Sequence, residues 1–549
     1  MKTPLKIYAI LVVFFCLMLS CEHKKEVTPI DKPKLVVGIV VDQMRYDYLT
    51  RFESQFGDDG FKRLTGKGFN FKNNHYNYIP TYTGPGHASI FTGTTPKYHG
   101  IIGNNWYDKV LKETVYCAGD ESVSSVGTTH NAGKMSPHRM LTTTFADENR
   151  LFTQMKGKSI GISLKDRGAI LPAGHTANGA YWFHGKDEGA WISSSFYISE
   201  LPEWVETFNA SDKAEQYFKT WDTFKELSTY SESGSDENNF EGGFNGKDTA
   251  AFPYDLNALK AENGNYDILK ATPYGNSLTA DFAMAAIKGE QLGKDATTDV
   301  LTVSFSSTDY VGHNFGVNSK EIEDTYIRLD ADLERFFQFL DTEVGAGEYV
   351  VFLTADHGAI NVPAYLDKNR IPSGYLNNQK TRTRFGEYIK SKFNSESLVE
   401  NVSNNQVFLN KAEVVSRNLD ITAIRRDIAN ELIAYDRVDK VYTAEAMINF
   451  NFTTGIESLL QNGYHQKRSG DIILVPETAF ISYGKTGSTH GSGLNYDTHV
   501  PLLFYGKGIK KGASYERTVI PDIAPTISAM LGISFPNAST GRPLTEILD

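Results

Sequence analysis

The segment Leu35–Asp42 reads LVVGIVVD, an uninterrupted run of apolar residues and one glycine that ends in a carboxylate. Polar and apolar positions do not alternate in it, which is typical of a strand buried on both faces of a parallel sheet. Three further runs are rich in apolar residues and also lead to charged or coordinating side chains. They are Ser159–Leu164 before Lys165, Val300–Phe305 before Asp309, and Tyr349–Leu353 before Asp356.

Helical periodicity lies between these runs. In Asn318–Asp341 the apolar residues recur at steps of three and four, and Asn318 with Glu321 resembles a capping box at the start. Alternating strands and helices predict a doubly wound α/β/α sandwich with a mostly parallel sheet. In such a fold, functional residues are expected beyond the carboxyl ends of the strands.

Length and composition allow one large domain with insertions. The chain has 549 residues, of which 40% are hydrophobic, and a net charge of −11. An acidic chain without a basic stripe argues against non-specific nucleic-acid binding, and the lack of repeats excludes a solenoid. Two segments interrupt the α/β rhythm, at about residues 180–295 and 365–480. We expect both to be cap-like insertions in a catalytic domain that spans residues 34–549.

The N-terminus has the form of an export signal. Lys2 and Lys6 give the chain a positively charged start. They precede an apolar run, Ile7–Leu19, that is too short to span a bilayer comfortably. The run leads to Cys21 in a context that resembles a bacterial lipoprotein box. The alternative is an ordinary cleaved signal with an incidental cysteine.

From this N-terminus we expect a signal peptide at residues 1–20 and a tether at residues 21–33 that follows a lipidated Cys21. The protein is then exported to the periplasm or outer cell envelope, and contacts the membrane only through its lipid anchor.

Six residues carry the side-chain chemistry of zinc ligands, which come from His, Asp, Glu or Cys. Asp309 and His313 are four apart, so a helical turn would place both on one face. The full set is Asp42, Asp309, His313, Asp356, His357 and His490. Each has an ordinary structural alternative, as a turn aspartate or a packed histidine. Histidines without such a grouping are expected to be structural: His75, His99, His138 and His465.

The segment Pro80–His87 reads PTYTGPGH. Its Gly-Pro-Gly predicts a sharp turn into a helix, with proline near the first helical position. The hydroxyl of Thr83 would then lie at a helix N-terminus, where the dipole and unpaired N–H groups favour phosphate. The alternative is that Thr83 merely caps that helix.

Together these segments resemble the alkaline phosphatase superfamily, and most closely the phosphate-irrepressible alkaline phosphatases of flavobacterial type. The resemblance covers nearly the whole mature chain and extends to Pro521–Thr526. It implies zinc-dependent hydrolysis of small phosphate monoesters to alcohol and inorganic phosphate. We expect the protein to be a monomer. It also implies that Thr83 is the nucleophile and forms a phosphothreonine intermediate.

The resemblance further implies the role of each side chain. One Zn²⁺ is held by Asp309, His313 and His490, and the other by Asp42, Asp356 and His357, with Thr83 bridging towards it. Asn104, Lys165 and Arg167 would contact the phosphoryl oxygens, where negative charge is concentrated.

The cationic pair Lys165 and Arg167 favours monoesters, because a monoester has an extra charged oxygen. The nearest alternative is a nucleotide pyrophosphatase/phosphodiesterase of the same superfamily, which generally lacks this pair. A sulfatase is less favoured, because no Cys-x-Pro-x-Arg or Ser-x-Pro-x-Arg segment is present. A non-catalytic surface protein would not need the intact ligand set and nucleophile.

Overall fold

The expected signal peptide and the lipidation site Cys21 lie outside residues 31–548, which are the residues that the computed structural model describes. The chain from Pro33 onward is one structural unit. Within residues 31–548, no helix has both the length and the apolar character that crossing a bilayer requires.

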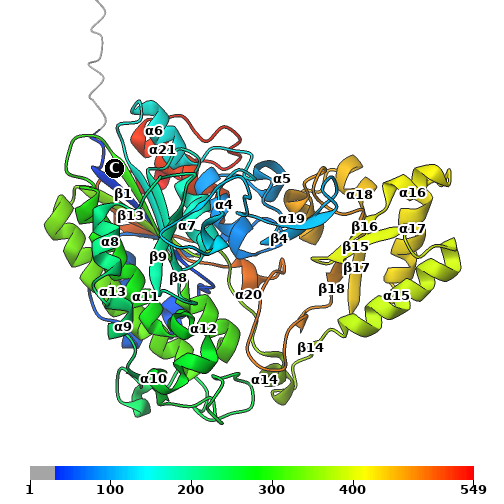
Figure 1. Ribbon diagram of the computed structural model, residues 1–549, viewed down its shortest axis with the longest axis horizontal. Coiled ribbons are helices and arrows are strands. Elements are labelled where there is room, and N and C mark those ends of the chain that lie inside the picture. The colour runs from blue at the N-terminus through cyan, green and yellow to red at the C-terminus, as the bar shows by residue number, and fades with distance from the viewer. Residues whose placement is uncertain (1–30, 549) are drawn as a thin grey trace, which may run out of the picture. The chain divides into compact units, whose positions relative to one another are not determined.

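A ten-stranded sheet runs through the part of the chain from Pro33 to residue 548 (Figure 1). Its central strands are parallel and lie in the order β13 (Tyr349–Thr354), β1 (Leu35–Val41), β12 (Asp299–Phe305), β7 (Ser159–Ser163) and β8 (Gly179–His184). The four apolar runs predicted as strands are therefore four neighbours in the sheet. Every residue of these four strands is buried, as expected for strands covered on both faces.

Further strands extend the sheet at its two edges. Beyond β13 lie β20 (Leu502–Gly506), β2 (Phe69–Phe71) and β21 (Gly512–Ser514). Beyond β8 lie β9 (Ala190–Ser194) and β6 (Ser125–Val126), each antiparallel to its neighbour. The sheet is thus parallel at its centre, where the site residues are expected.

Helices cover both faces of the sheet. On one face α11 (Pro273–Gly289) packs against α12 (Ser307–Phe315) and α13 (Lys320–Leu340). On the other face α4 (Thr83–Thr92) packs against α7 (Asp166–Ala173), and Figure 1 shows the sheet between the two sets. The predicted doubly wound α/β/α sandwich is confirmed.

Helix α13 matches the helix predicted for Asn318–Asp341, but its predicted capping box is wrong. The N-cap is Ser319, whose hydroxyl accepts a hydrogen bond from Ile322 N at 3.1 Å. Serine and asparagine are comparable caps, so tertiary contacts decide between them. The amide of Asn318 donates to Asn361 Oδ1 at 2.8 Å instead.

The first expected insertion, at about residues 180–295, does not lie wholly outside the sheet. Strands β8 and β9 belong to the sheet, and α11 packs against β12. Between β9 and α11 the chain forms short helices and loops, including α8 (Glu203–Asn209).

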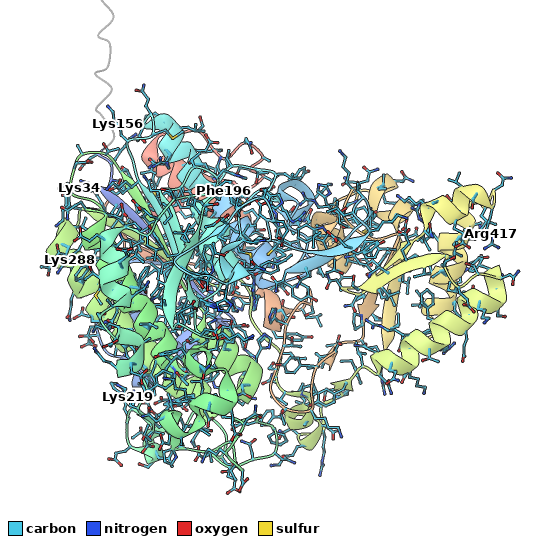
Figure 2. All side chains as sticks on the ribbon, in the orientation of Figure 1. Lys34, Lys156, Phe196, Lys219, Lys288 and Arg417 are labelled. Carbon is cyan, nitrogen blue, oxygen red and sulfur yellow. The ribbon has the colours of Figure 1, made fainter. Side chains whose placement is uncertain are left out.

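Within this unit, residues 378–476 contain a second, smaller sheet, and we name this part the four-stranded lobe. It contains an antiparallel sheet of β15 (Val399–Ser403), β16 (Gln406–Leu409), β18 (Ile472–Pro476) and β17 (Val438–Thr443). Helices α15 (Asn378–Phe393) and α17 (Ile421–Leu432) bury apolar side chains in the core of this lobe. Figure 2 labels Arg417, which lies on the lobe. We propose that the lobe is the second insertion.

Candidate active site

The four neighbouring parallel strands β13, β1, β12 and β7 end at one edge of the sheet, and the expected site residues follow them there. Asp42 comes directly after β1, and Asp309 lies on α12, which begins two residues after β12. Asp356 follows β13, and Lys165 is the N-cap residue of α7 after β7. Side chains that are far apart in the sequence are therefore brought together by the sheet order.

Asp42, Asp356 and His357 form one buried group whose ligand atoms all lie within 4.8 Å of one another. His357 Nε2 lies 3.5 Å from Asp42 Oδ1 and 3.5 Å from Asp356 Oδ2. In tetrahedral zinc with bonds of about 2.0–2.2 Å, neighbouring ligand atoms are separated by roughly 3.3 Å. Those two carboxylate oxygens are buried and have no hydrogen-bond partner among the described residues. The group therefore fits a metal cation.

Asp309, His357 and His490 form a second group with the same 4.8 Å limit. Asp309 Oδ1 lies 3.2 Å from His313 Nε2 and 3.7 Å from His490 Nε2. The rings of His357 and His490 are stacked, with centroids 3.4 Å apart. His313 thus contacts Asp309 but does not belong to the second group. His357 belongs to both groups.

Three imidazoles of the site share one hydrogen-bonding pattern with the backbone. Each has Nδ1 within hydrogen-bond distance of a carbonyl oxygen: His313 with Ser488 (2.7 Å), His357 with Gly358 (3.0 Å) and His490 with Thr81 (2.7 Å). An Nδ1–H that donates to a carbonyl leaves the lone pair on Nε2, as metal ligation requires. Burial lowers the pKa of His357 and of His490, which also favours the neutral, ligating form.

Thr83 is the first residue of α4, and the N-cap of that helix is Tyr82. The Thr83 hydroxyl is therefore not the capping group, contrary to the ordinary alternative. Its Oγ1 lies 3.5 Å from His357 Nε2, and the side chain is buried. Gly86 permits this placement, because a Cβ there would lie 2.4 Å from the Asp356 carbonyl oxygen.

Asn104 lies beside the start of the same helix. Its Oδ1 accepts a hydrogen bond from Gly84 N at 2.7 Å. Arg167 donates from Nη1 to Tyr116 Oη at 3.2 Å, while its Nε is buried and has no hydrogen-bond partner among residues 31–548. Both side chains therefore retain donors that no described protein group takes.

Lys165 lies between the two metal-capable groups. Its Nζ donates to Asp42 Oδ2 at 2.6 Å and to Asp309 Oδ2 at 2.5 Å, and all three side chains are buried. Burial raises the pKa of Asp42 well above its usual range, with Asp309 and Asp356 adding to the effect. Burial alone would lower the pKa of Lys165, but Asp309 and Asp42 raise it above its usual value. The predicted contact of Lys165 with a phosphoryl oxygen stays a prediction.

Two contributors to the site were not predicted from the sequence. Gln43 donates from Nε2 to Asp309 Oδ1 at 2.6 Å and from its backbone N to Asp356 Oδ1 at 3.1 Å. His87 lies 2.9 Å from the Thr83 carbonyl through Nδ1, and the same nitrogen lies 3.4 Å from Asp356 Oδ2. Gln43 directly follows Asp42, and His87 lies in the PTYTGPGH segment. These positions were the sequence features that could have indicated a role in the site.

Four histidines predicted to be structural are in no metal-capable group within residues 31–548: His75, His99, His138 and His465. His99, for example, is buried and bonds to Ser89 Oγ at 2.9 Å. Cavities lie on two sides of the site. One of about 500 Å³ is lined by His313, Tyr310 and Tyr483, and one of about 440 Å³ lies between His490 and the four-stranded lobe.

Comparisons with known proteins agree with this fold. The sequence matches the type I phosphodiesterase / nucleotide pyrophosphatase family over residues 36–500. It is 43% identical to alkaline phosphatase PafA of Elizabethkingia meningoseptica, over 94% of this chain and 95% of that protein. It is also 43% identical to alkaline phosphatase PhoV of Synechococcus elongatus, over 98% of each. A crystal structure of wild-type PafA, 43% identical, gives a TM-score of 0.91 and covers 95% of this chain and 100% of that one.

The chain therefore belongs to the type I phosphodiesterase / nucleotide pyrophosphatase family, within the alkaline phosphatase superfamily. The predicted resemblance to that superfamily is confirmed, and the chain is an enzyme of the alkaline phosphatase type.

Proposed function

We propose that this enzyme hydrolyses phosphate monoesters to an alcohol and inorganic phosphate, with two Zn²⁺ ions and Thr83 as the nucleophile. One observation carries the proposal: the buried Thr83 hydroxyl lies 3.5 Å from His357 Nε2, within a group of buried carboxylates and imidazoles. A hydroxyl at the start of a helix and beside metal ligands is suited to attack on a phosphoryl group. Two relatives named alkaline phosphatases support the same reaction.

Each zinc ion would be held by three protein ligands. One set is Asp309, His313 and His490, and the other is Asp42, Asp356 and His357, with Thr83 towards the second ion. When bound, a metal pair stabilises charge on both the attacking and the leaving oxygen of an in-line displacement. Manganese and cobalt also bind mixed nitrogen and oxygen ligands, so elemental analysis of the purified protein decides between metals.

Thr83 Oγ1 attacks phosphorus, the ester oxygen departs as the alcohol, and a phosphothreonine remains. Water then replaces Thr83 at phosphorus, which releases inorganic phosphate and restores the hydroxyl. Asn104 accepts from Gly84 N through Oδ1, which leaves its amide donors for a phosphoryl oxygen. The partnerless Nε of Arg167 suits the same task. Lys165 would supply a second positive charge beside the phosphoryl group.

A nucleotide pyrophosphatase/phosphodiesterase is the second candidate, because the matched family has that description. Lys165 and Arg167 favour monoesters, since a diester replaces one charged oxygen with an organic group. Rates on an aryl monoester and on the diester with the same leaving group separate the two functions. A higher kcat/KM for the diester would favour the second candidate.

Export and anchoring are part of the same proposal. Cleavage after residue 20 would leave Cys21 as a lipidated N-terminus, and the mature enzyme would act as a monomer in the periplasm or outer cell envelope. Partitioning into the membrane fraction is expected for the wild type and is expected to be lost in Cys21→Ala. A wholly soluble wild type would reject the anchor.

Hydrolysis of a chromogenic phosphate monoester before and after chelation tests the proposed reaction. Activity is expected to disappear with the metal and to return when Zn²⁺ is added. Undiminished activity in protein shown by elemental analysis to be free of metal would contradict the proposal.

A further inference from the structure

Another group of metal-binding side chains lies near the β9 edge of the sheet. His184 ends β8, Asp187 and Glu188 lie in the turn between β8 and β9, and His130 lies in the loop after β6. Strand β6 pairs with β9, which brings that loop beside the hairpin turn. In Figure 2 the end of β9 can be found from the label of Phe196, which lies two residues beyond that strand. We name these four side chains the hairpin cluster.

The distances within the hairpin cluster match those between ligands of one metal ion. Asp187 Oδ2 lies 3.2 Å from His130 Nε2 and 3.7 Å from His184 Nε2, and His184 Nε2 lies 3.2 Å from Glu188 Oε2. All four ligand atoms lie within 4.8 Å of one another. Ligands of a tetrahedral zinc ion are separated by roughly 3.3 Å, so the cluster needs little rearrangement to close around an ion.

The ring of His184 faces two carboxylates without donating a hydrogen bond to either. Its Nε2 is buried and has no hydrogen-bond partner in the described chain, although carboxylate oxygens lie close to it. The rings of His130 and His184 are 5.3 Å apart between centroids, and Asp187 Oδ2 lies near the Nε2 atoms of both. A cation between the two Nε2 atoms and the carboxylate oxygens would be a common partner for all four side chains.

The surrounding structure holds the cluster in this arrangement. Thr128 donates from Oγ1 to Glu188 Oε1 at 2.8 Å, so Glu188 Oε2 is the oxygen that faces His184. Asn265 donates from Nδ2 to the Lys186 carbonyl at 2.9 Å and fixes the turn. Gly189 ends the turn at φ 64°, and a Cβ there would lie 2.5 Å from the Tyr266 ring. Such outer contacts orient ligands before the metal arrives.

We propose that His130, His184, Asp187 and Glu188 bind one divalent transition-metal ion, with Zn²⁺ preferred, separately from the active-site metals. Two nitrogen and two oxygen ligands suit zinc, whereas calcium and magnesium take oxygen ligands. Four protein ligands leave no open position, so the ion is structural rather than catalytic. It cross-links the loop after β6 to the β8–β9 hairpin.

The metal content of His130→Gln tests this proposal. Metal-stripped protein is saturated with Zn²⁺, freed of excess metal, and analysed for zinc per chain. His130 is half exposed, so the variant is expected to fold. We expect one zinc ion fewer per chain than in the wild type, and the same loss in Asp187→Asn. Because zinc per chain in the variant is compared with zinc per chain in the wild type, the result does not depend on how many ions the active site holds.

His138→Gln is the matched control, because His138 is a partly exposed histidine that pairs with one carboxylate, Asp120, at 3.4 Å. It is expected to keep the wild-type zinc content. With Co²⁺ in place of Zn²⁺, the wild type is expected to show more absorption from tetrahedral cobalt than His130→Gln. Equal metal content in wild type and His130→Gln, or equal cobalt spectra, would overturn the proposal.

Hydrolysis of the chromogenic monoester, measured at saturating zinc on the same samples, separates this inference from the proposed function. Unchanged rates in His130→Gln together with the loss of one ion are the expected result. Inactivity of every sample would count against the proposed function and leave the metal difference as a test of the hairpin cluster. Loss of activity in His130→Gln alone would contradict a purely structural ion.

Discussion

Lys165 Nζ lies 2.5 Å from Asp309 Oδ2, and the same nitrogen lies 2.6 Å from Asp42 Oδ2. One buried ammonium thus joins a carboxylate from each of the two metal-capable groups. Buried carboxylates need cationic partners, and metal ions would supply further positive charge to both groups. The stability of this centre is therefore expected to depend on Lys165 most strongly when metal is absent.

Lys165→Met is expected to lower the free energy of unfolding of the metal-stripped protein by about 3–5 kcal/mol, because buried carboxylates lose their paired cation. With zinc bound, the loss should be smaller. Denaturant titrations with and without zinc measure both values. Lys34→Met is a control, since Lys34 pairs with Glu348 at the surface at 3.4 Å. Equal destabilisation of Lys165→Met with and without zinc would contradict this expectation.

Thr83→Ala is expected to retain the fold and the zinc content but to lose most monoesterase activity, because the attacking oxygen is gone. Thr83→Ser restores a hydroxyl at the same Cβ and is expected to recover part of the rate. Measurements of kcat, zinc content and circular dichroism on both variants check this. Full activity of the alanine variant would refute the nucleophile assignment.

Arg167→Ala is expected to reduce kcat/KM for an aryl monoester by a factor on the order of 100, equivalent to about 3 kcal/mol. The loss on the matched diester should be much smaller, because the diester lacks the extra charged oxygen. Arg417→Ala, on the four-stranded lobe, serves as a control remote in sequence. Equal losses on the two substrates would count against the role of Arg167 in choosing monoesters.

Asp497 supports the backbone beside His490, because its Oδ2 accepts from Ser492 N at 2.7 Å and Gly491 N at 3.1 Å. Burial raises the pKa of Asp497 to about 7, against the opposing effect of the Ser492 hydrogen bonds. The unfolded carboxyl titrates near pH 4, so the folded state binds this proton more tightly. Its contribution to stability is present below about pH 4 and is lost as the pH rises towards 7.

Asp497→Asn removes that titration. Relative to the wild type, the variant should gain on the order of 4 kcal/mol of unfolding free energy as the pH rises from about 4 to about 8. The hydrogen bonds lost by the substitution shift the difference by a constant amount. Denaturant unfolding of metal-stripped protein over this range measures the difference, and a difference that does not change with pH would rule out a raised pKa.

The central strands could be predicted because they are buried on both faces. Leu35–Val41 forms β1 with the predicted bounds, and its lack of alternation follows directly from that burial. The short strand Gly179–His184 did not stand out, because glycine and aromatic residues made it look like the insertion that follows. The sequence favours Asn318 as a helix cap, but a tertiary hydrogen bond engages its side chain elsewhere.

Long-range pairing explains why the remaining features could not be predicted from the sequence. The six expected ligands could be selected by their positions after strands and by resemblance, but the pairing of Lys165 with two of their carboxylates depends on the order β1, β12, β7. Three members of the hairpin cluster lie within residues 184–188, but His130 meets them only through the pairing of β6 with β9.

The phosphothreonine intermediate is tested most directly by mass spectrometry of the enzyme quenched in acid during turnover of a phosphate monoester. Phosphate is expected on the peptide that contains Thr83, and none on that peptide in Thr83→Ala. Phosphate on a different residue, or an unphosphorylated Thr83 in an enzyme whose alanine variant turns over at the wild-type rate, would contradict the proposed intermediate.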